Sequence, residues 1–109
     1  MKKIKNTMLE MISHCDCSRT FEACPNCPKH FIDLTEEQKE ILCNWIDLNL
    51  TRIKDVNNRT LDSYGLKGRF ERSPGGFYIL NGAFKGAMVH MGYKHSKGIN
   101  WYFNIKKVK

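Results

Sequence analysis

Residues 35–53 read TEEQKEILCNWIDLNLTRI, and this stretch carries the clearest fold signal in the chain. Thr35 with Gln38 three residues later has the form of a capping box, in which each side chain accepts from the other residue's backbone amide. Apolar residues then recur at helical spacing, at Ile41, Leu42, Trp45, Ile46, Leu48, Leu50 and Ile53. The pattern predicts a helix from 35 to about 53, and its broad apolar stripe predicts that this is the central helix of the fold.

Upstream of this helix, four of the five cysteines fall within residues 15–27 in the pattern C-x-C-x6-C-x2-C. The N-terminus is basic, but Asn6 and Glu10 interrupt the apolar run that a signal peptide needs, so we expect a cytoplasmic protein. In the cytosol cysteines stay reduced, and clustered cysteines there usually bind metal. The sequence therefore predicts a zinc ion held by Cys15, Cys17, Cys24 and Cys27.

The zinc ion is expected to be structural, because four thiolates close the coordination sphere whereas a catalytic zinc keeps one position open. Prolines 25 and 28 stiffen the second pair of ligands. His14 and His30 lie close enough in sequence to replace one cysteine in a Cys3His set. The competing interpretation is a group of reduced, buried cysteines or a redox pair. Cys43 lies in an apolar helical run and is predicted to be a lone core thiol.

Charge is divided unequally along the 109 residues, whose net charge is +7. Residues 1–50 carry six basic and eight acidic residues, whereas residues 51–109 carry twelve basic and three acidic ones. A cationic half of this kind favours contact with nucleic acid or an acidic protein surface, although simple solubility also explains it. The residues predicted to make such contacts are Lys67, Arg69, Arg72, Lys85, Lys94 and Lys97.

In this C-terminal half the sequence predicts a helix over 60–72, a turn at 73–76, a strand over 77–80, a helix over 82–91 and a strand over 100–105. The fold class is then α+β, mainly helical, with a short two-stranded antiparallel sheet. This order resembles a winged helix, in which the helix over 82–91, with Asn81 and Lys85 exposed, would enter a groove. The basic loop 93–98 would be the wing. The alternative is an ordinary small α/β core with a basic rim.

We expect a single domain over residues 1–109. Residues 1–34 are expected to contain a short helix over 2–13 and the zinc loop. The central helix lies in residues 35–56, and residues 57–109 form the basic helix-strand-helix-strand module. His90 and His95 stand in no catalytic motif, and the chain has no glycine-rich phosphate loop. The sequence therefore predicts a protein that is not an enzyme, takes no small-molecule substrate and spans no membrane.

Four segments carry a resemblance to other proteins: Ser63–Lys67, Gly76–Ile79, Asn81–Lys85 and Asn100–Ile105. They resemble a module of small proteins from Gram-positive phages and mobile elements, over about residues 57–105. With the cysteine cluster in front, the chain also resembles a zinc-binding anti-CRISPR protein of the type II class. That resemblance implies a stoichiometric inhibitor that docks on the effector nuclease of the bacterial host and keeps target DNA from loading.

Many anti-CRISPR proteins mimic DNA with acidic surfaces, and this basic chain departs from that pattern. This departure leaves two modes of binding: docking on an acidic patch of the nuclease, or contact with its guide or target nucleic acid. A second hypothesis is a DNA- or RNA-binding, winged-helix-like regulator of a phage or plasmid. A third is a structural subunit of a replication or packaging complex.

Overall fold

The computed structural model describes residues 24–108. Its elements in chain order are the 3-10 helix η2 (Pro28–Phe31), α2 (Glu36–Asn49), β1 (Leu50–Arg52), α3 (Ser63–Glu71), α4 (Asn81–His90) and β2 (Ile105–Val108). This is a small, mainly helical α+β structure with a two-stranded antiparallel sheet, as predicted. The helix predicted over 2–13, the predicted ligands Cys15 and Cys17, and the alternative ligand His14 lie outside the described residues. No helix between residues 24 and 108 is long and apolar enough to cross a membrane.

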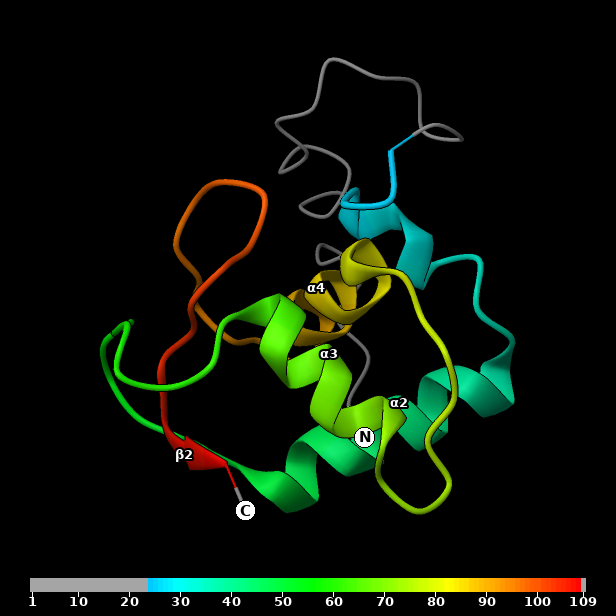
Figure 1. Cartoon of the computed structure of the whole chain (residues 1–109), viewed down its shortest axis with the longest axis horizontal. Helices are drawn as coiled ribbons and strands as arrows, with labels where there is room; N and C mark the ends of the chain where they lie inside the picture. The colour runs from blue at the N-terminus through cyan, green and yellow to red at the C-terminus, as the bar shows by residue number, and fades with distance from the viewer. Residues whose placement is uncertain (1–23, 109) are drawn as a thin grey trace.

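The helix at the centre of the structure is α4, not α2 (Figure 1). All its residues are buried, and it contacts η2, α2 and α3. A helix that is covered on every side needs apolar or small side chains around its circumference, and Gly82, Ala83 and Phe84 meet that need. A helix is present over most of 35–53, but the prediction that it is the central helix is wrong. The expectation that Asn81 and Lys85 are exposed is also wrong, because they are only 5% and 3% exposed.

Helix α2 begins as predicted, with a complete capping box. The amide of Gln38 donates to Oγ1 of Thr35 at 3.1 Å, and the amide of Thr35 donates to Oε1 of Gln38 at 3.0 Å. The helix ends at Asn49 and not at residue 53. The reason is that Leu50 to Arg52 leave the helix to form β1 and pair with the C-terminal strand.

The sheet joins β1 to β2, with Leu50 opposite Val108 and Arg52 opposite Ile105, and the register shifts between these pairs. Neither strand was predicted as such. Residues 77–80 form no strand, and of the predicted strand 100–105 only the last residue belongs to β2. The predicted two-stranded sheet is therefore present, but between other segments, and the strands expected on either side of a recognition helix are not formed.

Residues 77–80 and 100–105 were expected to pair in a sheet, but they form hydrogen bonds with residues of α3 instead. The carboxylate of Glu71 accepts from the amide of Ile79 at 3.0 Å. At the other end of α3, Ser63 and Trp101 exchange two hydrogen bonds: the amide of Ser63 donates to the Trp101 carbonyl at 2.7 Å, and the Trp101 amide donates to Oγ of Ser63 at 3.0 Å. Both segments are thereby fixed against α3.

Residues 93–104 form a hairpin that projects beside α4 (Figure 1). His95 and Phe103 make an antiparallel bridge, and the amide of Ser96 donates to the carbonyl of Tyr102 at 2.9 Å. The His95 ring stacks on the Trp101 ring, with centroids 3.7 Å apart. The loop predicted as a wing, 93–98, is thus one arm of this hairpin.

The C-terminus of α4 closes with a Schellman motif. Gly92 adopts a φ of 84°, a conformation that glycine reaches without strain. Its amide donates to the carbonyl of Val89 at 2.9 Å, and the amide of Tyr93 donates to Met88 at 3.0 Å. The Arg52 guanidinium then donates to the Gly92 carbonyl at 3.0 Å, which ties β1 to the end of the central helix.

Cys43 is buried in the core, which confirms the prediction of a lone core thiol. Burial raises the pKa of the Cys43 thiol from 9.0 to about 11, so the reactive thiolate is scarce at neutral pH. We expect iodoacetamide to label Cys43 only once the chain is unfolded. Mass mapping of peptides from native and denatured samples measures this, and labelling of native Cys43 as fast as a free cysteine would contradict the burial.

Candidate metal knuckle and basic surface

Residues 24–27, called the knuckle from here on, are docked on the first turn of α4 by three hydrogen bonds. The carbonyl of Pro25 accepts from the amide of Gly82 at 2.9 Å. The carbonyl of Asn26 accepts from Nζ of Lys85 at 3.0 Å, and its side-chain oxygen accepts from Nδ2 of Asn81 at 3.0 Å. The turn that carries two of the predicted zinc ligands is therefore held rigidly by the central helix.

Gly82 allows the knuckle to approach α4 this closely. A Cβ atom at this position would lie 2.1 Å from the carbonyl oxygen of Cys27 and 2.6 Å from its carbonyl carbon. Both atoms belong to the backbone, which cannot move aside as a flexible side chain could. Only glycine therefore fits where the knuckle crosses the helix.

The thiols of the knuckle are buried, with Cys24 2% and Cys27 3% exposed. Nε2 of His30 donates to the carbonyl of Cys24 at 2.6 Å, and the His30 amide donates to the carbonyl of Cys27 at 3.1 Å. With Nε2 donating to the knuckle backbone, His30 supports the turn, and Nδ1 is the ring nitrogen through which it would bind a metal ion.

Among residues 24–108, no three His, Cys, Asp or Glu side chains are grouped so that they could hold a metal ion. Cys24 and Cys27 fit one half of the predicted zinc site, since they are two buried thiols on a stiffened C-x2-C turn. Cys15 and Cys17 would hold the ion from the other side. A closed set of thiolates would give zinc a structural role here, because it would tie the chain before the knuckle to α4.

Lys85 connects the knuckle to the hairpin from inside the structure. Its Nζ donates to the carbonyls of Asn26 and Ile99, at 3.0 and 2.9 Å, and lies 4.2 Å from the centroid of the Trp101 ring. With this burial and these partners, Lys85 is a structural lysine. It cannot contact a phosphate or a partner protein in this fold.

Lys67 is also held within the structure. Its Nζ lies 2.8 Å from Oε2 of Glu71, and it sits over the exposed rings of Tyr64 and Tyr78 at 5.3 and 5.1 Å from their centroids. The same carboxylate of Glu71 accepts from the amide of Ile79, so one acidic group links the middle of α3 to the segment that leads into α4.

The charge of Glu71 makes stability depend on pH. Burial favours the protonated carboxyl, but the hydrogen bonds from Lys67 and Ile79 outweigh burial and hold the pKa of Glu71 below its ordinary 4.5. The stabilisation is thus complete above pH 4.5 and is lost as the pH falls through the lower pKa of the folded state. We expect Glu71→Gln to cost about 1 kcal/mol near neutral pH and to flatten the decline below pH 4.5. Urea unfolding across this pH range measures it, and parallel profiles for the two proteins would contradict it.

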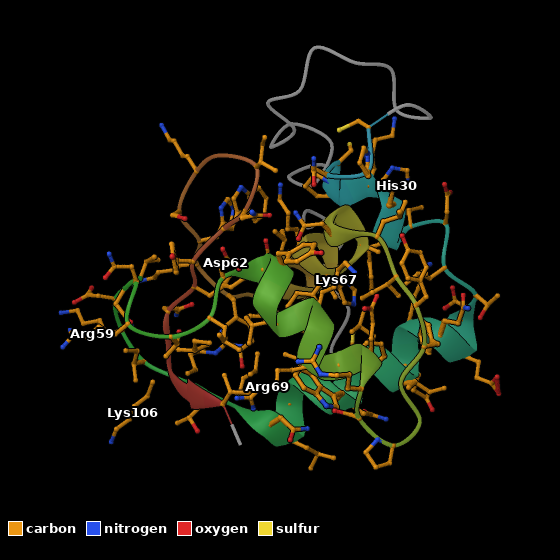
Figure 2. The ribbon with its side chains drawn as sticks, viewed as in Figure 1. His30, Arg59, Asp62, Lys67, Arg69 and Lys106 are labelled. Atoms are coloured by element: carbon orange, nitrogen blue, oxygen red, sulfur yellow. The ribbon has the colours of Figure 1, made fainter. Side chains whose placement is uncertain are left out.

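Four exposed cations come from the segments that meet where the loop after β1 runs along β2. They are Lys54, Arg59, Lys94 and Lys106, and we call them the basic strip. Nζ of Lys94 donates to the carbonyl of Lys54 at 3.1 Å, which joins the hairpin to this loop. Asn57 donates to the carbonyl of the residue before Lys106 at 3.0 Å. Figure 2 shows Arg59 and Lys106 at the same edge of the molecule.

The structure divides the six cations predicted to make contacts. Arg69 and Arg72 are exposed near the end of α3, Lys94 and Lys97 are exposed on the hairpin, and Lys67 and Lys85 are buried. Sequence reasoning missed Lys54, Arg59 and Lys106. No local signal marks them as a group, because Lys106 lies far along the chain from Lys54 and Arg59, and only the β1–β2 pairing brings its segment beside theirs.

Comparison with protein-family models, with curated proteins and with solved structures finds no match for this chain. No residue role can therefore be transferred from a relative.

Proposed function

We propose that this chain is a zinc-stapled, non-enzymatic inhibitor from a phage or mobile element. It acts in the bacterial cytoplasm, binds a type II CRISPR effector nuclease and blocks the loading or cleavage of target DNA. The observation that supports it most is the basic strip, four exposed cations on the side of the fold where strand pairing and the hairpin restrain the backbone. Such a surface suits an acidic patch on the nuclease, or the nucleic acid that the nuclease holds.

The burial of α4 favours this mode over reading of a DNA groove. A recognition helix must present an exposed polar face to the base edges. Every residue of α4 is covered by the rest of the fold. The cationic surface that is left can contact backbone phosphates or carboxylates, which gives attachment without sequence readout.

A pull-down joined to a cleavage assay tests the proposal. The tagged, zinc-loaded chain is used to capture the effector from cells that express it with its guide, and the same preparation is assayed for target cleavage. We expect the effector to co-purify and cleavage to fall until the chain and the nuclease are equimolar. Unchanged cleavage at a molar excess of the chain would overturn the proposal.

A pair of charge-matched variants locates the contact. Arg59→Glu/Lys106→Glu reverses two charges of the basic strip, whereas Arg69→Glu/Arg72→Glu reverses two exposed charges near the end of α3. We expect the first variant to lose capture and inhibition and the second to keep both. The reverse outcome would place the contact near the end of α3. If neither variant lost capture and inhibition, both surfaces would be excluded.

The basic strip equally supports a second candidate, a nucleic-acid-binding regulator. Binding through phosphates weakens steeply as salt rises, with a slope of log affinity on log salt of about −0.9 for each phosphate neutralised on duplex DNA. If four cations engage, reversing the charge of Arg59 and of Lys106 should make this slope clearly shallower. Fluorescence anisotropy with duplex DNA and with single-stranded RNA measures it, and affinity that is independent of salt would exclude this candidate.

A further inference from the structure

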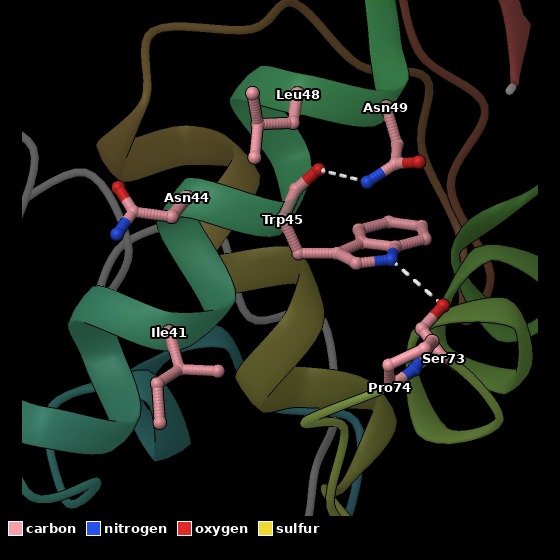
Figure 3. Close-up of a pocket in the computed structure, with 7 residues that line it drawn as sticks. All are labelled: Ile41, Asn44, Trp45, Leu48, Asn49, Ser73 and Pro74. Carbon is pink, nitrogen blue, oxygen red and sulfur yellow. Dashed lines mark hydrogen bonds between the residues drawn. The ribbon is translucent and has the colours of Figure 1, made fainter.

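An apolar hollow opens between α2 and the turn that follows α3 (Figure 3). It has a volume of about 410 Å³ and is lined by Ile41, Asn44, Trp45, Leu48, Asn49, Ser73 and Pro74. The Trp45 indole lies at its base and donates from Nε1 to Oγ of Ser73 at 2.8 Å. The indole also packs edge-on against Phe70 and Phe84, so the hollow is backed by the core and keeps its shape.

Large apolar side chains stand exposed around this hollow. Leu48 is 70% exposed and Ile41 is 37% exposed. A single exposed leucine is ordinary, but these two side chains lie two turns apart on one helix beside a concave surface, so they form one apolar patch with it that a partner can cover. Neither contributes to the core cluster of the described structure.

The exposed face of α2 is also acidic, in a chain whose net charge is +7. Glu37, Glu40 and Asp47 are all exposed, and helical spacing places them beside the Ile41–Leu48 stripe on the side away from Trp45. The nearby cations are turned elsewhere. Lys39 pairs with Glu36 at 3.0 Å. The Arg72 guanidinium lies over Gly68, so close that a Cβ atom added at Gly68 would be 3.1 Å from it.

From this combination we infer that α2 binds a basic amphipathic segment of a partner protein. An apolar side chain of the partner fills the hollow over Trp45, and lysines or arginines of the same segment lie along Glu37, Glu40 and Asp47. This is the geometry in which a helix lies in a groove. Nucleic acid does not suit this face, because the carboxylates repel phosphate. The inference does not depend on the nuclease proposal, since it concerns the acidic face and not the basic strip.

Amide NMR of the full, zinc-loaded chain tests the inference, because the chain has two tryptophans and so two indole N–H signals. The probe is a synthetic helical peptide of leucine and lysine at heptad spacing. We expect the Trp45 indole signal to shift as the peptide is added, while that of Trp101, 1% exposed, stays in place. A peptide with glutamate in place of lysine should leave both signals unchanged.

Matched variants make the test specific to the hollow. Leu48→Ser should weaken peptide binding about tenfold, the equivalent of about 1.4 kcal/mol. Ile99→Ser, which changes a side chain that is 66% exposed elsewhere, should leave it unchanged. Asp47→Asn should weaken binding and reduce its dependence on salt.

Three outcomes would overturn the inference. The first is a Trp45 signal that does not move at millimolar peptide, and the second is equal weakening of binding by both serine variants. The third is a Trp45 signal that moves with the concentration of the chain alone, because the occupant would then be a second copy of this chain.

Discussion

Gly82→Ala should destabilise the protein by about 3 kcal/mol, at the upper end of the usual cost of overpacking. The added methyl would lie 2.1 Å from the carbonyl oxygen of Cys27, so the knuckle would have to move away from α4. That movement would break the bond from the Gly82 amide to Pro25 and lengthen the bonds from Lys85 and Asn81 to Asn26. Urea unfolding followed by circular dichroism measures the loss.

Gly68→Ala is the matched control, because it adds the same methyl inside another helix. Its Cβ would meet only the end of the Arg72 side chain, at 3.1 Å, and that side chain can turn away. Alanine is also the better helix former by about 1 kcal/mol, so we expect Gly68→Ala to be neutral or stabilising. Equal destabilisation by the two variants would contradict the close contact between the knuckle and α4.

Lys85→Met should cost about 3 kcal/mol, because two partly buried carbonyls would lose the charged, buried donor that they share. Methionine replaces much of the aliphatic stem but leaves the oxygens of Asn26 and Ile99 without this partner. The knuckle and the hairpin would both loosen, since Lys85 is bonded to each. The change in urea midpoint measures the cost, and hydrogen exchange at residues 24–27 and 99–101 shows where the structure loosens.

Lys94→Met is the control for this effect. Nζ of Lys94 also donates to a backbone carbonyl, that of Lys54 at 3.1 Å, but the side chain is exposed and water can take its place. We expect little change in stability. If Lys94→Met lowered stability as much as Lys85→Met, the burial of Lys85 would not explain the loss of stability.

Local signals predicted the helices well. The capping box placed the start of α2 within a residue, and the helices predicted over 60–72 and 82–91 are observed as Ser63–Glu71 and Asn81–His90. The central helix was predicted wrongly because the polar residues Asn81 and Lys85 gave α4 the pattern of a surface helix. The small residues Gly82 and Ala83 were the sign that other segments approach it closely.

The strands could not be predicted, because their pairing depends on contacts far apart in the sequence. Leu50 continues the helical stripe of α2 although it begins β1, and the observed β2 contains two lysines that hide its alternation. Residues 77–80 look like a strand, but the carboxylate of Glu71 takes the amide of Ile79, which a neighbouring strand would otherwise bond.

The candidate sites were predictable to different degrees. The spacing of Cys24 and Cys27 gave the knuckle, and the structure adds what holds it, Gly82 and Lys85 on α4. Net charge predicted a cationic half but could not separate buried from exposed lysines. Lys67 and Lys85 both look available in the sequence, and both are buried. Lys67 pairs with Glu71 of its own helix, and Lys85 bonds a carbonyl of another segment.

Native mass spectrometry of the reduced, full-length chain tests the central claim, that zinc staples the knuckle, most directly. We expect a zinc ion on each chain, lost together with the folded state when a chelator is added, and absent from the Cys24→Ser/Cys27→Ser variant. A wild-type chain that stays folded with no bound metal, or a double variant that keeps its zinc, would contradict the claim.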